Sequence, residues 1–555
     1  MMKSARTELL IVLTALLFFV PGLGAVHLFD WDEINFAEIA REMLVTGDYM
    51  RPQVDFQPFW EKPPLFMWMQ VLCMKAFGVG EFAARLPNAI CGIVTLLVLY
   101  RIGKRLRNEV FGLLWVLAYL GSILPHLYFR SGIIDPWFNL FIFLSVHAFI
   151  LLCWNRAGRP QGPEGAGGWP YAVLAGLFMG LGTLTKGPVA FLILALTAGI
   201  YWVLQRFRIY FPWARILLAL VVMVLVDFTW FGIDWLINGS WFLDTFVTYQ
   251  IRLFSTPDAG HGGFFGYHFV VLLFGCFPAS LFAIHEMGRR SSDDDAQKDY
   301  RRWMLILFWV VLILFSIVKS KIVHYSSMCY FPLTYLAALS LERLWRGEVK
   351  APLWLRLSLG AIGSVVALVF IIAPFVGMRI DLLKPLVADP FGRANLDADV
   401  VWTGVEALAG IWMAVVLFFG HRYFSSGDFK RGLPVVFGGT ALFVTITLFF
   451  FINNVEGYSQ RAAVEFFEAR AKDTADGHLN YARNRNYRSY AQLFYTRKQP
   501  PPDERAYSED WLFHGDIDRP VYLVAKITSE EDVHAIGTFT ELYRKNGFIF
   551  YRRDP

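Results

Sequence analysis

The chain of 555 residues is long enough for three or four soluble domains, but its composition excludes an ordinary soluble protein. Hydrophobic residues make up 56% of the chain and charged residues only 17%, whereas soluble domains carry about 25% charge. The net charge of +5 is mild, and there is no basic stripe or zinc-finger spacing, so a nucleic-acid-binding protein is also excluded. These proportions predict an all-α polytopic membrane protein.

Apolar stretches divide most of the chain into predicted transmembrane helices of about 20 residues each. The first stretch follows Lys3 and Arg6 and lacks a good cleavage site, so we expect an uncleaved anchor rather than a signal peptide. Residues 1–453 are therefore predicted to form a transmembrane domain. We count thirteen spans, near residues 8–27, 83–101, 110–127, 133–153, 171–185, 187–204, 214–234, 264–285, 303–318, 327–341, 357–377, 401–420 and 432–453.

The distribution of positive charge predicts the orientation in the membrane. Arginine and lysine gather in alternate short loops, as in 101–107 and 206–215. The positive-inside rule places these loops, and the N-terminus with them, in the cytoplasm. The first outer loop (28–82) and a second long loop (235–263) are then expected on the outer, periplasmic or extracytoplasmic face of the inner (plasma) membrane.

The composition changes after residue 453, where long apolar runs stop and Arg, Asp, Glu and Tyr become more frequent. Residues 454–555 are therefore predicted to form a soluble α/β domain on the outer face. Within it, the patterns favour a helix over Ala462–Ala471 and strands over Val521–Ile527 and Phe548–Tyr551.

Two acidic residues, Asp32 and Glu33, stand directly after the first predicted span. The segment that follows them has the pattern of an amphipathic helix lying along the membrane interface. A carboxylate held there beside apolar side chains can have a raised pKa and act as a general base. The alternative is structural, because acidic residues also stabilise a helix N-terminus.

Several cations stand in predicted outer loops, against the positive-inside rule. Lys62, Lys186 and Arg252 come from three different loops, and Lys321 and Tyr325 share a fourth. A phosphate held at the outer leaflet would account for all of them, because several cations bind an anion together. Lysines that reach from the membrane interface toward water are the alternative.

Three further residues are candidates of a weaker kind. Asp135 begins an apolar helix and precedes a proline, which an N-terminal cap explains, yet a carboxylate at membrane depth is also a functional candidate. Glu61 and His261 offer ligand types suited to a divalent metal, zinc or magnesium, although they come from separate loops. An ordinary loop histidine is the alternative for His261.

Together these stretches resemble the membrane glycosyltransferases of the GT-C superfamily, and above all the lipid A aminoarabinose (4-amino-4-deoxy-L-arabinose) transferase family and its protein O-mannosyltransferase relatives. The resemblance covers roughly the whole membrane part. It rests on Trp31-Asp32-Glu33, Ala37-Glu38, Arg41-Glu42-Met43, Glu61-Lys62-Pro63, Ile134-Asp135-Pro136, Thr185-Lys186-Gly187, and Ser320-Lys321 with Tyr325.

The resemblance implies an inverting glycosyltransferase that uses a polyprenyl (undecaprenyl) phosphate sugar and no nucleotide. Asp32 matches the family's essential aspartate, with Asp135 as a second acidic position and Glu33 beside it. The residues implied around the donor phosphate are Lys62, Lys186, Arg252, Tyr325 and Lys321, and those implied as a metal pair are Glu61 and His261.

The implied acceptor is a lipid A or lipopolysaccharide-type glycolipid. This chain has Ile34-Asn35-Phe36 where the family often has Thr-Arg-Tyr, so the particular sugar and acceptor stay open. A protein serine or threonine, or another glycan, is an alternative acceptor. A transporter or flippase of lipid-linked sugars is the alternative from another class, but it would carry charges near the membrane midplane and inverted repeats, which this sequence lacks.

Overall fold

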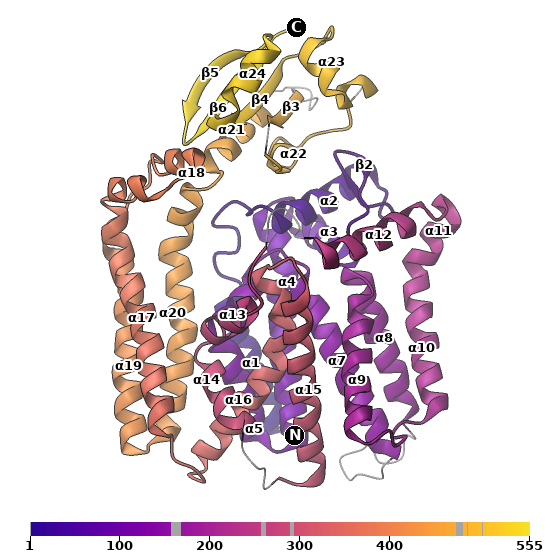
Figure 1. The fold of residues 1–555 in the computed structure, drawn as a ribbon, viewed down its shortest axis with the longest axis vertical. Coiled ribbons are helices and arrows are strands. Elements are labelled where there is room, and N and C mark those ends of the chain that lie inside the picture. The colour runs from indigo at the N-terminus through magenta and orange to yellow at the C-terminus, as the bar shows by residue number, and fades with distance from the viewer. Residues whose placement is uncertain are drawn as a thin grey trace.

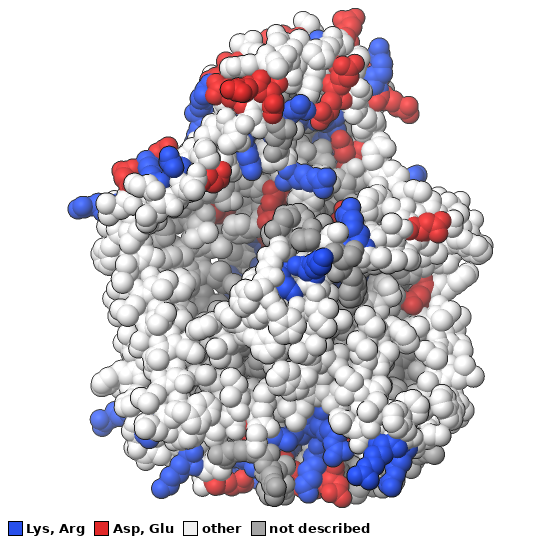
Figure 2. All heavy atoms as spheres, viewed as in Figure 1, with Lys and Arg blue, Asp and Glu red and all other residues white. Residues whose placement is uncertain are grey.

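The computed structural model describes residues 2–156, 168–256, 262–288, 293–472, 481–485, 487–501 and 503–555. Figure 1 shows long, roughly parallel helices capped at one end by a small sheet; that end is called the sheet end below, and the N-terminus lies near the opposite end. Most charged side chains on the face seen in Figure 2 gather near the two ends, with a wide, largely uncharged belt between them. This distribution is that of a multi-pass membrane protein, as predicted.

Apolar sequences form the helices of the bundle because a backbone in lipid must satisfy its own hydrogen bonds. A five-residue π-helical turn, Phe228–Gly232, joins two of these helices, α10 and α11. The bundle helices are α1 (Met2–Phe19), α4 (Glu81–Leu106), α5 (Glu109–Leu120), α6 (Ile123–Leu127), α7 (Asp135–Arg156), α8 (Trp169–Lys186), α9 (Val189–Leu204), α10 (Trp213–Asp227), α11 (Ile233–Asn238), α13 (Tyr267–Gly275), α14 (Ala279–Met287), α15 (Asp295–Ile317), α16 (Tyr330–Trp345), α17 (Leu353–Gly377), α19 (Leu408–Ser426) and α20 (Phe429–Gly457).

Each of the thirteen predicted apolar stretches overlaps a helix or a pair of consecutive helices. Within the described ranges, seven helices are long and apolar enough to cross a membrane, and two bent pairs raise that number to as many as nine. The pairs are α5 with Ile123–Arg130, bent by 83°, and α13 with α14, bent by 114°. The helical membrane fold is therefore confirmed, while the total of thirteen spans stays a prediction.

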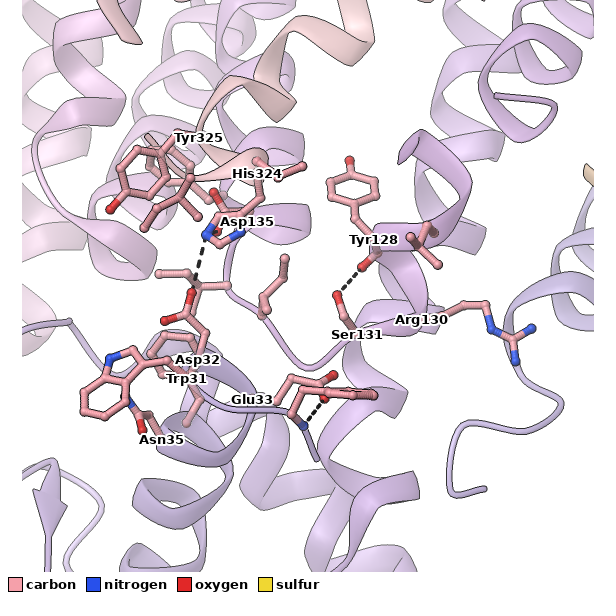
Figure 3. Close-up of a pocket in the computed structure, with 18 of the residues that line it drawn as sticks. Trp31, Asp32, Glu33, Asn35, Tyr128, Arg130, Ser131, Asp135, His324 and Tyr325 are labelled. Carbon is pink, nitrogen blue, oxygen red and sulfur yellow. Dashed lines mark hydrogen bonds and ion pairs between the residues drawn. The ribbon is translucent and has the colours of Figure 1, made fainter. Parts of the chain in front are cut away.

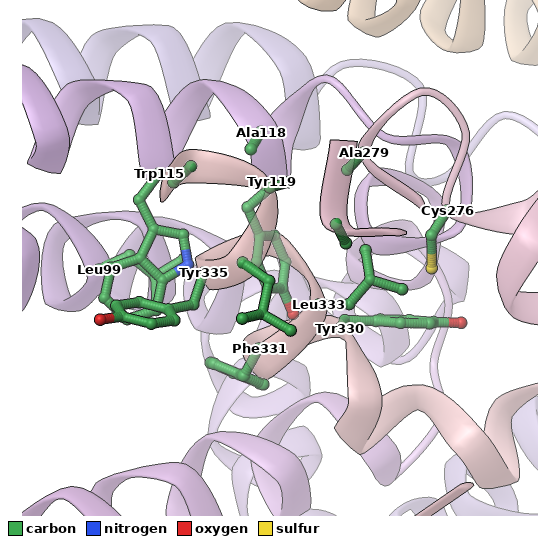
Figure 4. Close-up of a cluster of buried hydrophobic side chains, with 14 of the residues drawn as sticks. Leu99, Trp115, Ala118, Tyr119, Cys276, Ala279, Tyr330, Phe331, Leu333 and Tyr335 are labelled. Carbon is green, nitrogen blue, oxygen red and sulfur yellow. The ribbon is translucent and has the colours of Figure 1, made fainter. Parts of the chain in front are cut away.

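Aromatic side chains fill the centre of the bundle where α4, α5 and α16 meet (Figure 4). The ring of Trp115 lies 5.1 Å from that of Tyr335, and Tyr119 lies 5.3 Å from Phe331. The indole of Trp115 also donates a hydrogen bond of 3.2 Å to Thr334. Edge-to-face contacts of this kind fix the relative rotation of the helices, which gives the sheet end a rigid base.

The helices α8 and α10 approach each other through small residues. A Cβ atom on Gly176 would lie 2.2 Å from the carbonyl oxygen of Ala219, and one on Gly180 would lie 2.6 Å from Cβ of Val226. Only glycine fits at these two positions, which are four residues apart on one face of α8. Small residues at this spacing are typical of helices that pack closely in membranes.

The sheet end contains the first loop and the C-terminal region. The last ninety-odd residues form a four-stranded sheet of order β3-β4-β6-β5, in which β3 and β4 are parallel and the other neighbours antiparallel. The predicted C-terminal helix and both predicted strands are confirmed as α21, β4 and β6. The elements here are α2 (Asp32–Thr46), β1 (Gln53–Val54), β2 (Gln57–Pro58), α3 (Leu65–Phe77), α12 (Trp241–Ser255), α18 (Pro390–Asn395), α21 (Arg461–Lys472), β3 (Tyr481–Arg485), α22 (Ala491–Tyr495), α23 (Glu509–His514), β4 (Val521–Lys526), α24 (Glu530–Ile536), β5 (Thr540–Lys545) and β6 (Phe548–Arg553).

The helix α2 is not the interfacial amphipathic helix that the sequence predicts. All its residues from Glu33 to Met43 are buried. Two of its charged side chains pair with each other, since Arg41 donates to both carboxylate oxygens of Glu38 at 2.7 and 2.6 Å. The C-terminal region covers its outer side: the Tyr495 hydroxyl accepts a hydrogen bond of 2.7 Å from the Leu28 amide just before α2. Protein, not lipid headgroups, therefore surrounds α2.

Candidate active site

A cavity of about 1100 Å³ brings together segments that are far apart in the chain. Its walls come from the start of α2, the loop before α3, the facing ends of α7 and α8, α12, the turn before α16, and α20. The charged lining includes Asp32 and Glu33 of α2, and the apolar lining includes residues of α6 and α20, namely Leu124, Leu127, Leu448, Phe449 and Ile452. A cavity with both charged and apolar lining suits a ligand that has a polar headgroup and a lipid chain.

Four side chains at the centre of the cavity form a connected series. Nε2 of His324 lies 3.4 Å from Oδ2 of Asp32 and 3.7 Å from Oδ2 of Asp135. The other oxygen of Asp135 binds Nζ of Lys186 at 2.6 Å. Figure 3 shows the imidazole pointing between the two carboxylates. The start of α7 and the end of α8 place Asp135 and Lys186, so the series depends on bundle helices and not on loops alone.

The electrostatic state of Asp32 differs from the expectation. Burial raises the pKa of Asp32, but the interaction with the neighbouring His324 and the nearby charges of Lys62 and Lys186 together outweigh burial and hold its pKa below the ordinary value. The sequence suggests a raised pKa, because it shows the apolar neighbours but not the cations that the fold brings near. Asp32 is therefore a carboxylate at neutral pH, with 29% of its side chain exposed to the cavity.

Glu33 also lines the cavity, but it accepts hydrogen bonds from four donors, which favours a positioning role over the predicted catalytic one. Its oxygens accept hydrogen bonds from Nε and Nη2 of Arg85 at 3.0 and 2.8 Å, and from the amides of Phe29 and Gly132 at 2.9 and 2.5 Å. Burial raises the pKa of Glu33, but the charge of Arg85 and these hydrogen bonds lower it overall. A saturated carboxylate is a poor proton acceptor, so Glu33 fixes the start of α2 and thereby the position of Asp32.

Four of the five predicted phosphate-binding residues line the cavity. Nζ of Lys62 and Cζ of Arg252 lie 4.9 and 5.2 Å from the centre of the Tyr249 ring, on α12. Nζ of Lys186 lies 5.0 Å from the ring of Tyr325. Each of these three cations thus lies within cation–π distance of an aromatic ring that also lines the cavity.

The fifth, Lys321, is not among the lining residues, so its predicted role as a phosphate ligand gains no geometric support. Its ammonium group donates to the carbonyl oxygens of Phe315 and Ser316 at 3.0 and 2.8 Å, and also to that of Val318. These are the last carbonyl groups of α15, which have no partner within the helix. Lys321 therefore caps this helix.

The predicted metal pair gains no geometric support. His261 lies outside the described residues. Glu61 accepts a hydrogen bond of 3.3 Å from Tyr249, and the cations of Lys62 and Arg252 lie close to the Tyr249 ring. Two positive charges so close to Glu61 would repel a divalent metal ion. Among the described residues, one group has side chains placed close enough together to bind a metal ion: Glu530, His534 and Glu541 in the C-terminal region. Both carboxylates of this group form ion pairs with Arg544.

Sequence reasoning missed three residues of the site. His324 directly precedes Tyr325, which the sequence predicts to bind the donor phosphate, so its position in the chain could have indicated it. Asp30 borders the cavity, where burial among protein atoms raises its pKa to about 7 although part of its surface faces the open space. Arg488 also lines the cavity, but it belongs to the C-terminal region. Nothing in its local sequence indicates that it lines the same cavity as Asp32.

Comparison with known proteins defines the class. Residues 61–230 match the family model described as dolichyl-phosphate-mannose-protein mannosyltransferase. The fold matches the crystal structure of ArnT from Cupriavidus metallidurans bound to undecaprenyl phosphate with a TM-score of 0.75, at 20% identity over 98% of this chain and 97% of that one. The protein is a membrane glycosyltransferase of the GT-C superfamily, as the sequence predicts.

The nearer relatives define the family. The undecaprenyl phosphate-alpha-4-amino-4-deoxy-L-arabinose arabinosyl transferase of Edwardsiella ictaluri (strain 93-146) is 30% identical over 76% of this chain and 74% of its own length. The enzyme of the same name from Enterobacter sp. (strain 638) is 27% identical over 67% of this chain and 66% of its own length. The chain belongs to this arabinosyl transferase family.

Proposed function

We propose that the protein transfers an aminoarabinose-type sugar from undecaprenyl phosphate to a lipid A or lipopolysaccharide-type glycolipid at the outer face of the inner membrane. The names of the relatives support the sugar and the donor, and the related crystal structure is described as bound to undecaprenyl phosphate. The observation that carries the proposal is an ionised Asp32 in one cavity with Lys62, Lys186 and Arg252.

In the proposed reaction, the bond between the anomeric carbon and the donor phosphate oxygen breaks. The phosphodiester becomes a phosphate monoester and gains negative charge as this bond breaks. Lys62, Lys186 and Arg252 are already in place along one wall, so they stabilise the leaving group more in the transition state than in the bound donor. The acceptor oxygen forms the new bond from the opposite side of the anomeric carbon, which inverts its configuration.

Asp32 acts on the acceptor. If the acceptor group is a hydroxyl, Asp32 takes its proton. If the acceptor group is a phosphate oxygen, no proton is transferred, and Asp32 helps to orient the acceptor through the hydrogen-bond donors that surround the carboxylate. His324 and Asp135 position the carboxylate and Lys186 relative to each other. No step needs a metal ion, and a divalent metal at Glu61 and His261 stays a prediction.

The proposed orientation puts the sheet end outside and the N-terminus in the cytoplasm. The basic last turn of α4, which includes Lys104 and Arg105, follows Arg101, whose side chain pairs with Glu8 near the N-terminus and so away from the sheet end, in agreement with the positive-inside rule. We also propose that residues 1–453 form the transmembrane domain and residues 454–555 a soluble outer domain. Labelling of single cysteines by an impermeant reagent in intact cells tests both: a cysteine at Arg505 should react and one at Lys104 should not.

Transfer is tested with the purified full-length protein in liposomes, radiolabelled undecaprenyl-phosphate aminoarabinose and a panel of acceptors. We expect label in lipid A and equimolar release of undecaprenyl phosphate. Because the matching family model is named for protein mannosylation, a serine- and threonine-containing peptide belongs in the panel. Label in the peptide with none in lipid A would show that the acceptor is a protein and not lipid A. The absence of transfer from any undecaprenyl-phosphate sugar would overturn the proposal.

A further inference from the structure

Arg488 reaches the cavity from the C-terminal region. It lies between β3 and α22, more than 450 residues after Asp32 in the sequence, yet both side chains line the same cavity. Its side chain is exposed, and within the described part of the chain its guanidinium has no hydrogen-bond or ion-pair partner. A guanidinium is permanently charged and offers five N–H donors, so Arg488 is available to an anion that enters the cavity.

The backbone that carries Arg488 is well anchored. The next residue, Ser489, is buried; its hydroxyl accepts a hydrogen bond of 3.1 Å from the Ala491 amide and donates one of 3.3 Å to the side chain of Gln460. The Ser489 carbonyl accepts a hydrogen bond of 3.1 Å from the side chain of Asn484 on β3. Arg488 therefore extends from a fixed position rather than from a free loop tip.

The same segment forms one wall of the cavity together with the residues around the catalytic aspartate. The ring of Tyr490, two residues after Arg488, lies 5.4 Å from that of Trp31, next to Asp32. Arg488 thus belongs to the wall of residues 30–32. Lys186 and Arg252 come instead from α8 and α12.

The other cations of the cavity already have defined contacts. Arg85 is held by Glu33 and Lys186 by Asp135. Arg130 donates to the carbonyl of Phe18, near the end of α1, at 2.8 Å and to the carbonyl of Pro21 just after that helix. Arg488 differs from them because the described residues supply no acceptor for its guanidinium, which leaves it for the ligand.

We propose that Arg488 binds an anionic group of the acceptor, a phosphate on the glycolipid, and thereby contributes to acceptor specificity. The inference rests on the proposed function. Inversion puts the acceptor and the leaving phosphate on opposite sides of the anomeric carbon, so the acceptor lies on the side of Asp32 and the donor phosphate on the side of Lys186 and Arg252. The planar guanidinium matches a phosphate through two parallel hydrogen bonds.

The test compares Arg488→Ala and Arg488→Lys with the wild-type protein, and uses Arg505→Ala, an exposed residue of the same C-terminal region that does not line the cavity, as the matched control. Transfer is measured while donor and acceptor are varied in turn. We expect Arg488→Ala to raise the acceptor KM about 10- to 100-fold, the loss of one charge-assisted contact, with the donor KM unchanged. Arg488→Lys should recover part of the loss, and Arg505→Ala should show none.

Equilibrium binding of a glucosamine lipid with and without its phosphate separates this inference from the proposed function. The wild-type protein should prefer the phosphorylated lipid, and Arg488→Ala should lose that preference. An unchanged acceptor KM and preference in Arg488→Ala would overturn the inference, as would equal effects on donor and acceptor KM. Failure of the wild-type protein to transfer any sugar would contradict the proposed function instead, while the binding comparison would still decide the role of Arg488.

Discussion

Lys186 and Asp135, 51 residues apart in the sequence, form an ion pair in which Nζ and Oδ1 are 2.6 Å apart. The pair joins the end of α8 to the start of α7, two helices that pack along their length. It explains how a lysine can lie between two apolar helices, and it holds the ammonium group at the edge of the cavity. The second oxygen of Asp135 faces His324, so the pair is also linked to Asp32.

Asp32→Asn should abolish transfer. The amide keeps the shape of the side chain but removes the negative charge and the proton acceptor, a loss of about 10²- to 10⁴-fold in kcat for a general base. Single-turnover transfer to lipid A measures this loss, and thermal unfolding shows that the variant is folded. Normal turnover by a folded Asp32→Asn variant would contradict the role of Asp32.

Lys62→Ala and Lys186→Ala should weaken donor binding. Each removes one cation from the wall that faces the donor phosphate, so the affinity for undecaprenyl phosphate should fall about 10- to 100-fold in each variant. Binding of undecaprenyl phosphate to detergent-solubilised protein measures this directly. Unchanged affinity for undecaprenyl phosphate in both variants would show that Lys62 and Lys186 do not bind the donor phosphate.

Lys321→Met should leave donor affinity unchanged but lower stability. The ammonium group caps α15, and removal of a charged donor from buried carbonyl groups costs about 1–3 kcal/mol. Thermal unfolding followed by tryptophan fluorescence measures this effect, alongside the binding assay used for Lys62→Ala. A tenfold loss of donor affinity without a change in melting temperature would show instead that Lys321 binds the donor phosphate.

His27 should make stability depend on pH. Burial lowers the pKa of His27, but its hydrogen bond of 2.8 Å to Glu456 and the negative charges of Glu456, Glu468 and Glu81 together outweigh burial and raise the pKa above 6.5. The protonated form is favoured in the folded protein, so this stabilisation is complete below pH 6.5 and is lost as the pH rises through the raised pKa. The melting temperature should fall over that interval in the wild-type protein and less in His27→Gln. The exposed His534→Gln is the control, and an identical pH slope in His27→Gln and wild type would contradict the prediction.

Asp30 should make transfer depend on pH near neutrality. Burial raises its pKa to about 7, so it is mostly neutral below pH 7 and ionised above. Ionisation adds negative charge to a cavity that receives an anionic acceptor, so the acceptor KM should increase as the pH rises through 7. Asp30→Asn should flatten this increase. A profile of the same shape in Asp30→Asn and wild type would exclude Asp30 as its cause.

The helical membrane fold could be predicted from sequence because apolar runs report directly on lipid exposure. The bends were harder: the stretch 110–127 was predicted as one span, but the chain turns by 83° between α5 and Ile123–Arg130. Such a break depends on packing against neighbours such as Phe277, whose carbonyl oxygen accepts the Ile123 amide at 3.2 Å. Local hydrophobicity carries no signal for that contact.

The site could be predicted where a residue violates a simple rule. Lys62, Lys186 and Arg252 stood out because cations are unexpected in those loops, and all three line the cavity. Lys321 met the same criterion but binds carbonyl groups next to it, and Glu33, chosen as an acidic residue after the first span, is held by Arg85, since local charge does not reveal which way a side chain points. Arg488 had no signal, because its relation to Asp32 exists only after the C-terminal region has packed on the first loop.

That packing has a consequence for biosynthesis. When a ribosome has completed α20, the bundle helices and the first loop have been made, but Tyr490, which covers Trp31, and Tyr495, which accepts the Leu28 amide, have not. The nascent chain therefore cannot assemble its full catalytic chamber until its last segment has emerged and folded back. A truncated translation product would lack this wall, so competence is reached only near the end of synthesis.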